Sequence, residues 1–352
     1  MKYIYKLISF LINIFSYLFI FIKPKYDFIV IQKFSDQLTV NTKDICNKLI
    51  NDGYEVKVVY STTNNFINII RDIFYTQFGN IIVIDSFSLG ISNVKRFKQK
   101  KIIQIWHALG AIKKFGYQSL DTKNGRSSIQ AKYLRMHKNN YSIIATSEST
   151  KKIYEKAFNN KRVEVYKLPE MNYSVNKVNI GKRSILYLPT YRENSMFGVK
   201  ELIDNIDHNI YDFNFKLHKN DEVNTEYSQY QTNANVFFLL QECDILITDY
   251  SAACFSAAIN KTPIIFYWHD KDEYIKDRGL NLDDKYLKNV CYDVSTVIKS
   301  LHGLDKSDYL VKDYLNAKDD VCDYLIDLIK KWFHLESFFI LKRILYMLLS
   351  YK

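Results

Sequence analysis

Short runs of apolar, often β-branched residues alternate with longer polar segments along most of the chain. In the first half, the runs short enough for single strands are 28–32, 55–60, 81–86, 101–107 and 141–147. Between the first two runs, segment 36–54 places Leu38, Ile45 and Leu49 at helical spacing, and Gly53 is positioned to end the helix. This order predicts a strand, a helix and a second strand, the unit from which parallel α/β sheets are built.

The same pattern restarts after about residue 170. The later strand candidates are 184–191, 213–218, 244–250 and 262–268, with helical or loop segments between them. Segment 169–183, "PEMNYSVNKVNIGKR", lacks this periodicity and is the expected linker. The chain therefore predicts two α/β domains with parallel sheets, at 26–170 and 171–330.

The two ends of the chain are apolar and flanked by positive charge. Segment 7–22 carries only Ser and Asn as polar residues, yet it is shorter than the ~20 residues that span a bilayer, and no cleavage site of small residues follows it. Segment 331–352 mixes Lys and Arg with Trp, Phe, Leu and Ile, as interfacial helices do. We expect 1–25 and 331–352 to hold the protein peripherally on anionic lipids at the cytoplasmic face of the membrane. The alternative is that both are core helices packed against each other.

The net charge indicates what kind of partner the protein binds, and the cysteine content indicates its redox environment. The chain has 352 residues and a formal net charge of +11, which indicates an anionic partner: nucleic acid, a phosphorylated substrate or an acidic lipid surface. Its five cysteines are scattered and form no C-x-x-C pair. They suggest neither a disulfide framework nor a zinc site, and a reducing cytosol fits best.

Polar side chains gather where the predicted strands end. Neither G-x-G-x-x-G nor a P-loop is present, so phosphate binding would use helix amino termini and side chains. Ligands of parallel sheets bind outside the carboxyl ends of the strands. The residues at those ends are Trp106, His107, Thr190, Arg192, His218, Lys219, Thr248, Asp249, Tyr250 and Ser251. Together they supply imidazoles, a guanidinium, an ammonium group and hydroxyls, suited to binding a pyrophosphate and removing a proton from an alcohol.

Four stretches carry a resemblance to a known family. "WHALGAIKKFGY", "ILYLPTYRE", "KLHKN" and the segment that begins "DILITDYSAACFSAA", within residues 100–285, resemble the successive motifs of the CDP-glycerol glycerophosphotransferase family, which primes and extends teichoic acids. The resemblance implies a GT-B architecture, in which two Rossmann-like domains face a cleft. It also implies transfer of glycerol phosphate from CDP-glycerol to a hydroxyl of an undecaprenyl-diphosphate-linked acceptor, with release of CMP and without a cofactor.

The resemblance also implies roles for individual residues. His107, beside Trp106, would be the general base, and His218 would contact the diphosphate as CMP leaves. Thr190 and Arg192 would face the cleft, with a salt bridge between the domains as the alternative for Arg192, and Lys219 would add positive charge at the diphosphate.

The stretch at 248–251 would form the rest of the donor site. Ser251 and the backbone N–H groups that follow Thr248 and Tyr250 would meet the diphosphate at the start of a helix. Asp249 would cap that helix or accept a hydrogen bond from a ribose or glycerol hydroxyl.

The chain departs from the family pattern at a few positions. Ala108 stands where the family usually has Gly, Lys219 where it has Pro, and Ala252 and Ser256 where it has Ser and Asp. These changes keep CDP-ribitol or another CDP-alditol as an alternative donor. The "DKD" at 270–272 resembles a metal-binding D-x-D, but we expect an exposed acidic turn there and no bound metal.

Other classes of protein fit the sequence less well. A nucleic-acid-binding module would explain the positive charge, but no recognition motif is present and the aromatic residues fall in apolar strands, so we expect no nucleic-acid partner. A GT-B glycosyltransferase that uses a nucleotide sugar for a capsule or lipid-linked glycan is the nearer alternative, and it would release a nucleotide diphosphate. A catalytically silent membrane scaffold would have little use for both His107 and His218. A primase, a polymerase and a capsule enzyme would all share these motifs.

Overall fold

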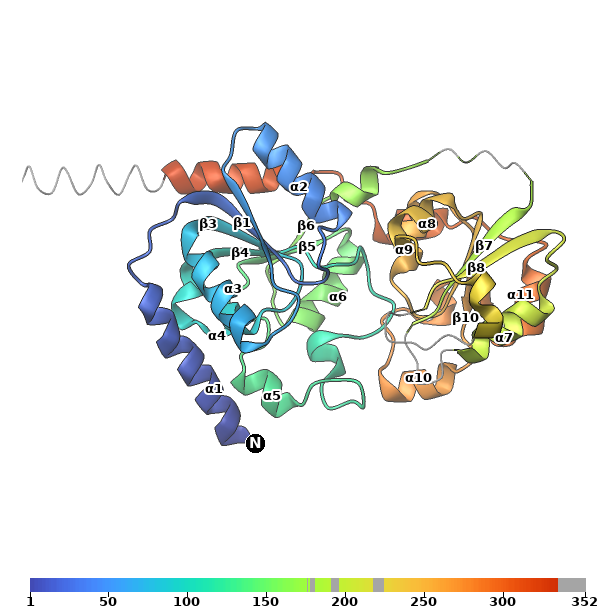
Figure 1. Ribbon diagram of the computed structural model, residues 1–352, viewed down its shortest axis with the longest axis horizontal. Coiled ribbons are helices and arrows are strands. Elements are labelled where there is room, and N and C mark those ends of the chain that lie inside the picture. The colour runs from blue at the N-terminus through green and yellow to red at the C-terminus, as the bar shows by residue number, and fades with distance from the viewer. Residues whose placement is uncertain (176, 178–180, 191–195, 218–224, 335–352) are drawn as a thin grey trace, which may run out of the picture.

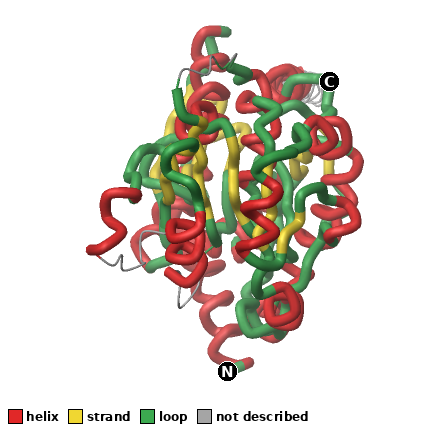
Figure 2. The backbone as a smooth tube through the Cα atoms, turned by 90° about the vertical axis from the view of Figure 1, so that its right-hand side faces the viewer, coloured by secondary structure: helices red, strands yellow, loops and turns green. Residues whose placement is uncertain are grey.

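The computed structural model describes residues 1–175, 177, 181–190, 196–217 and 225–334 (Figure 1). Two α/β units lie side by side, and each has a parallel sheet at its centre with helices packed around it (Figures 1 and 2). The expected pair of α/β domains with parallel sheets is confirmed.

The first sheet has the strand order β2-β1-β3-β4-β5-β6, and all its pairings are parallel. Its strands are β1 (Tyr26–Gln32), β2 (Val56–Tyr60), β3 (Gly79–Ile84), β4 (Lys101–Gln104), β5 (Ser142–Ala145) and β6 (Val163–Val165). Its helices are α2 (Val40–Asn51), α3 (Phe66–Phe78), α4 (Leu89–Asn93), α5 (Ser128–Tyr133) and α6 (Glu148–Phe158). Side-chain oxygens of Thr39 and Asn65 accept backbone N–H groups at the starts of α2 and α3, which fixes where these helices begin.

The second sheet has the order β11-β10-β9-β7-β8, again with all pairings parallel. Its strands are β7 (Arg183–Leu188), β8 (Tyr211–Phe215), β9 (Ile245–Thr248), β10 (Ile264–Tyr267) and β11 (Val290–Cys291). Its helices are α7 (Met196–Asn205), α8 (Val236–Glu242), α9 (Ala253–Ile259), α10 (Lys271–Asp277), α11 (Val294–Ser300) and α12 (Asp308–Tyr314). Short 3₁₀ segments are Ser16–Phe19, Lys95–Gln99, Gly116–Ser119, Pro169–Asn172, Thr225–Tyr230 and Asp284–Tyr286.

Several contacts join the two units. Glu170, at the start of the expected linker, accepts hydrogen bonds from Asn41 Nδ2 of the first unit at 3.1 Å and from Ser256 Oγ of α9 at 2.5 Å. Asn281 Nδ2 donates to the carbonyl oxygen of Lys113 at 3.0 Å. These bonds hold the segment after β4 and the start of the linker against the second unit.

The chain returns to the first unit near its end. Ala317 N donates to Thr146 O at 2.9 Å, and Lys167 N donates to Asp319 O at 2.7 Å. A helix over 321–334 then packs its apolar side into the shared core of the two units. Residues 317–330, which we expected in the second domain, therefore lie against the first.

Helix α1 (Lys2–Phe15) lies on the outside of the first unit, where it packs against α4 and α5. Its core-facing contact is Ile12, whereas its outer side exposes Tyr3, Ile4, Leu7, Phe10, Leu11 and Ile14. Figure 1 shows α1 at the lower left and the helix over 321–334 at the upper left, so the described parts of the two ends do not form one core pair. Within the described ranges, no helix is both long and apolar enough to cross a bilayer.

Candidate active site

The segment after β4 turns sharply at Trp106. This residue has a φ of 55°, in the left-handed region that a bulky side chain seldom adopts. The turn brings His107 to the end of β3, where its Nδ1 lies 3.0 Å from Ser86 Oγ and 3.3 Å from the carbonyl oxygen of Asp85. The backbone at Trp106 thus places the imidazole at the carboxyl edge of the sheet.

The partners of Nδ1 define the state of the His107 ring. Because a carbonyl oxygen only accepts hydrogen bonds, the contact with Asp85 O requires the tautomer that carries its proton on Nδ1, and Nε2 then keeps its lone pair; the Ser86 hydroxyl can accept or donate. No residue in the described part of the chain bonds Nε2. Burial, together with the positive charge of Lys113, lowers the pKa of His107 to about 4, although the hydrogen bond to Asp85 acts in the opposite direction. The ring is therefore neutral at pH 7, as a general base must be.

Two aromatic rings flank the imidazole. Phe34 stacks on His107 with ring centroids 4.2 Å apart and an interplanar angle of 6°, and Trp106 lies at 4.1 Å and 34°. Phe34 is nonetheless 57% exposed. The faces of the imidazole are thus covered by apolar rings, and its Nε2 edge is the part left for a substrate.

Asp85 is a site residue that our sequence analysis missed. It is 1% exposed, and its carboxylate accepts hydrogen bonds from Gln32 Nε2 at 2.6 Å and from the backbone nitrogens of Lys33 and Phe34 at 2.8 and 3.1 Å. Burial raises the pKa of Asp85 to about 6, and these N–H donors oppose that shift. One residue thus holds both the Phe34 loop, through its carboxylate, and His107, through its carbonyl oxygen. The signal in the sequence was the carboxylate that ends the apolar run "IIVIDS".

The segment that follows His107 is fixed from both units. Tyr154 Oη donates to Ala108 O at 2.9 Å, and Thr146 Oγ1 donates to Leu109 O at 2.6 Å. A Cβ on Gly110 would lie 2.6 Å from the ring of Phe255 in α9, so only glycine allows this close approach. Ala108, by contrast, has a negative φ, and the backbone does not require glycine there.

The matching edge of the second sheet centres on Asp249. Its carboxylate accepts from Thr190 N at 2.9 Å and from Thr190 Oγ1 at 2.8 Å, and Trp268 Nε1 donates to its carbonyl oxygen at 3.0 Å. Helix α9 has no side-chain cap. Capping, one of the two roles that we predicted for Asp249, is therefore wrong, because the carboxylate ties the ends of β7 and β9 together.

The neighbours of Asp249 differ in how far they can reach a ligand. Thr248 and Tyr250 are fully buried, and their hydroxyls donate to Leu188 O at 2.6 Å and to Asp270 Oδ1 at 3.0 Å. These two side chains therefore point into the protein and support the end of β9 and the residues that follow it. Ser251 is half-buried, and its Oγ accepts from Ala253 N at 3.3 Å.

The structure brings Trp106 and His107 together on the first sheet, and Thr190, Asp249 and Ser251 on the second. Three predicted site residues, Arg192, His218 and Lys219, lie outside the described residues.

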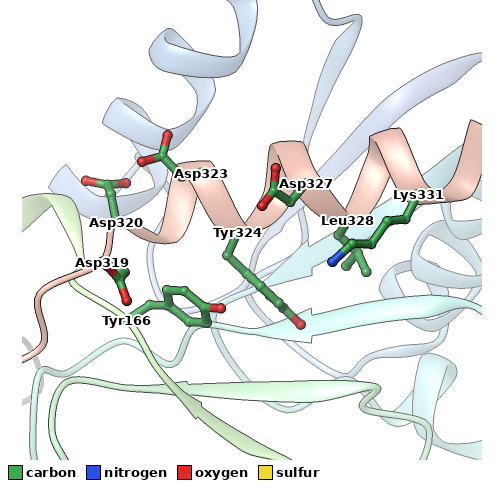
Figure 3. Close-up of a pocket in the computed structure, with 8 residues that line it drawn as sticks. All are labelled: Tyr166, Asp319, Asp320, Asp323, Tyr324, Asp327, Leu328 and Lys331. Carbon is green, nitrogen blue, oxygen red and sulfur yellow. The ribbon is translucent and has the colours of Figure 1, made fainter.

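A hollow of about 380 Å³ lies away from this site (Figure 3). It is lined by Tyr166, Asp319, Asp320, Asp323, Tyr324, Asp327, Leu328 and Lys331. Its four carboxylates would repel a phosphorylated substrate. Among the residues with a described position, no group of three His, Cys, Asp or Glu could hold a metal ion, and Asp270 of the "DKD" turn accepts a hydrogen bond from Tyr250.

Comparisons of sequence place the chain among known proteins. The profile of the family described as CDP-Glycerol:Poly(glycerophosphate) glycerophosphotransferase matches residues 15–325. The teichoic acid glycerol-phosphate primase of Bacillus subtilis (strain 168) is 30% identical over 264 residues, which are 67% of this chain and 68% of that protein. The teichoic acid ribitol-phosphate primase of Bacillus spizizenii (strain ATCC 23059 / NRRL B-14472 / W23) is 24% identical over 295 residues, 72% of this chain and 76% of that protein.

Comparison of structures agrees with this placement. A structure of the wall teichoic acid polymerase TagF superposes with a TM-score of 0.71 at 18% identity, covering 96% of this chain and 98% of that one. The UDP-GlcNAc 2-epimerase from Methanocaldococcus jannaschii superposes with a TM-score of 0.53 at 10% identity, covering 86% and 99%. At these identities the likeness concerns the fold, and the two facing parallel sheets are those of the GT-B architecture.

Proposed function

Because this chain belongs to the CDP-glycerol:poly(glycerophosphate) glycerophosphotransferase family, we propose that it transfers glycerol phosphate from CDP-glycerol to a hydroxyl of an undecaprenyl-diphosphate-linked acceptor and releases CMP. The observation that carries the proposal is the state of His107. Its Nδ1–H is held by the backbone of Asp85, and its Nε2 lone pair has no partner in the described part of the chain. A neutral, oriented imidazole is what proton removal from an alcohol requires.

The proposed reaction is a single displacement at phosphorus. Nε2 of His107 takes the proton of the acceptor hydroxyl while that oxygen attacks the phosphorus that bears glycerol. A new P–O bond forms, the bond between this phosphorus and the bridging oxygen breaks, and CMP leaves with the bond's electrons. Phe34 and Trp106 keep water from the faces of the imidazole, so it stays neutral until it accepts the proton.

The donor is assigned to the second sheet. Thr190 and Ser251 place hydroxyls at its carboxyl edge, and Asp249 fixes the Thr190 loop. We propose that Arg192, His218 and Lys219 add positive charge around the diphosphate, since charge-assisted bonds are the strong ones for phosphate. We also propose that Trp106 borders the substrate, and that Thr248 and Tyr250 support the donor site through the strand end.

Ribitol phosphate is the second candidate group, because a ribitol-phosphate primase is also among the relatives. The test is CMP release by the purified protein given CDP-glycerol, CDP-ribitol or a panel of nucleotide sugars, each with and without a polyprenyl-diphosphate-linked disaccharide. We expect acceptor-dependent CMP from CDP-glycerol. Nucleotide diphosphate released from a sugar donor, with no CMP from either alditol, would contradict the proposal. The mass of the product then shows whether one unit or many are added.

We further propose that α1 binds the protein peripherally to anionic lipids, at the cytoplasmic face of the membrane, where a lipid-linked acceptor is presented. The helix exposes a row of large apolar side chains, contains no acidic residue, and carries Lys2 and Lys6 in its first two turns. Exposed apolar side chains with flanking lysines fit the interface of an anionic bilayer. Residues 335–352, expected to add a second contact, lie outside the described part of the chain.

Vesicle sedimentation tests the role of α1. We expect the protein to pellet with vesicles that contain phosphatidylglycerol and to remain in solution with phosphatidylcholine alone. Replacing Leu7 and Phe10, which are 55% and 59% exposed, by Glu should abolish pelleting without altering CMP release from a water-soluble acceptor. Changing the equally apolar but separate Phe238 to Glu is the control. Unchanged pelleting of the α1 variant would rule this surface out.

A further inference from the structure

A second group of polar side chains lies beside the His107 site and has no role in the proposed chemistry. The guanidinium of Arg126 lies over the ring of Phe87, 4.8 Å from its centroid. Phe87 in turn packs edge-on against the buried ring of His137, with centroids 5.3 Å apart. Phe87 directly follows Ser86, whose hydroxyl bonds Nδ1 of His107. One aromatic residue therefore separates this group from the catalytic histidine.

Arg126 forms no ion pair with a carboxylate among the described residues. Neighbouring protein atoms lower its pKa, and no carboxylate of the described residues acts in the opposite direction. The residue is nevertheless open to solvent. A guanidinium that has lost part of its hydration without gaining a counter-charge favours binding of an anion.

The surroundings of His137 also indicate a binding site next to Arg126. It is 5% exposed, its φ is 54°, and its Nδ1 has no hydrogen-bond partner among the described residues. Burial and the charge of Arg126 lower its pKa to about 3, so it is a neutral ring at pH 7. It also contacts Trp106, with centroids 6.2 Å apart. A buried Nδ1 without a partner and a backbone in the left-handed region are features that recur at binding sites.

The loop that carries Arg126 is built to hold one shape. Asp121 N donates to the carbonyl oxygen of Arg126 at 3.0 Å, and Gly125 N donates to Thr122 O at 3.0 Å. A Cβ on Gly125 would lie 1.6 Å from Ser119 O, so no other residue fits there. The backbone at Arg126 is thus held in a defined turn, and the guanidinium rests on the ring of Phe87.

We propose that Arg126, with His137 beside it, forms a subsite for the diphosphate group of the acceptor. The assignment to a diphosphate on the acceptor rests on the proposed function. It follows from position, because the group lies on the first unit next to the base, where the acceptor hydroxyl must be, whereas the donor is assigned to the second sheet.

Binding by calorimetry tests the subsite directly. The full chain is titrated with a water-soluble, short-chain prenyl diphosphate that carries a disaccharide and, separately, with CDP-glycerol and with inorganic pyrophosphate. The variants are Arg126→Gln, Arg126→Lys and His137→Phe, and Lys138→Ala removes one exposed positive charge from the same region as a control. Arg126 is exposed, so its variants should unfold at the same urea concentration as the wild type.

We expect Arg126→Gln to weaken binding of the prenyl diphosphate about ten- to hundredfold, as loss of charge-assisted hydrogen bonds does, and to leave CDP-glycerol unaffected. Lys in its place should restore part of the affinity, and His137→Phe should cause a smaller loss. Inorganic pyrophosphate should show the same ranking.

Three results would overturn the subsite: affinity for the prenyl diphosphate that is unchanged in Arg126→Gln, an equal loss in Lys138→Ala, or a loss confined to CDP-glycerol, which would make Arg126 a donor residue. Because binding needs no turnover, the two proposals fail separately. Binding that depends on Arg126 without CMP release from any donor would contradict the proposed function alone. CMP release with an unchanged acceptor KM in Arg126→Gln would contradict the subsite alone.

Discussion

At the carboxyl edge of each sheet, an aspartate fixes a neighbouring loop, but the two loops present different side chains. Asp85 follows β3 and Asp249 follows β9, and each carboxylate accepts backbone N–H groups from the loop after the neighbouring strand. These loops are the one at Phe34 after β1 and the one at Thr190 after β7. In both units an aspartate at a strand end fixes the adjacent loop.

The difference lies in what each loop presents. The first edge lays the ring of Phe34 on a neutral imidazole, whereas at the second edge Asp249 holds the hydroxyl of Thr190 and Ser251 Oγ accepts a hydrogen bond from Ala253 N. Apolar rings around a histidine favour its uncharged form, and the Ser251 hydroxyl, whose oxygen accepts from Ala253 N, keeps its proton to donate to an anionic diphosphate. On this comparison rests our proposal that proton removal occurs at the first sheet and donor binding at the second.

The largest expected effect comes from removing the base. His107→Ala should lower kcat by about 10²- to 10⁴-fold, the range typical of a general base, while the Kd for CDP-glycerol stays unchanged. His302→Ala, at an exposed position of the second unit, is the control for loss of an imidazole. If His107→Ala kept more than about a tenth of the wild-type kcat, the first edge would not carry the chemistry.

Removing the carboxylate of Asp249 should weaken donor binding and lower the stability of the fold. Asp249→Ala leaves the backbone N–H and the hydroxyl of Thr190 without their acceptor, which should cost about 2 kcal/mol in the free energy of unfolding and weaken CDP-glycerol binding roughly tenfold. Urea unfolding and calorimetry measure the two effects. Asp212→Ala, an exposed carboxylate on β8 of the same sheet, is the matched control. Weaker acceptor binding with intact donor binding would reverse the assignment.

The pH profile separates Asp85 from His107. The pKa of Asp85 is raised to about 6 and that of His107 is lowered to about 4. As pH falls through about 6, Asp85 gains a proton and loses hydrogen-bond acceptor capacity for the Phe34 loop, so kcat/KM of the wild type should decline there. Asp85→Asn should be less active by roughly tenfold at pH 7 and flat through that region. A wild-type decline only near pH 4 would mean that the carboxylate does not control the loop.

The smallest effect is expected from the ring that covers the base. Phe34→Leu keeps the backbone bonds to Asp85 but removes the stacked contact with His107, which should lower kcat/KM several-fold, as loss of an aromatic pair typically does. Phe66→Leu, an exposed aromatic residue on α3, is the control. A loss as large as that of His107→Ala would give Phe34 a direct part in the reaction.

The fold could be predicted from the sequence because both sheets are parallel and buried. Strands such as β1 are continuous apolar runs, and the polar segments between them have helical spacing. The short strands β6 and β11 were not predicted, since three and two residues leave no pattern to detect. The return of 317–334 to the first unit is a tertiary contact that periodicity does not encode.

The site was only partly predictable for a related reason. The position of His107 followed from the strand end and the motif, but its tautomer depends on the backbone oxygen of Asp85, which a sequence does not place. Thr248 and Tyr250 looked like ligands because they are polar residues at a strand end, yet their hydroxyls are used inside the protein. Polar residue type indicates the edge of a sheet, whereas burial decides which side chains face a ligand.

The most direct measurement is the protonation state of His107 by ¹⁵N NMR of protein labelled at its seven histidines, with the signals of this ring assigned from a His107→Gln spectrum. At pH 7 the account predicts a proton on Nδ1, a bare lone pair on Nε2, and titration of the ring only near pH 4. A proton on Nε2, or a charged ring at pH 7, would contradict the central claim that His107 is the base.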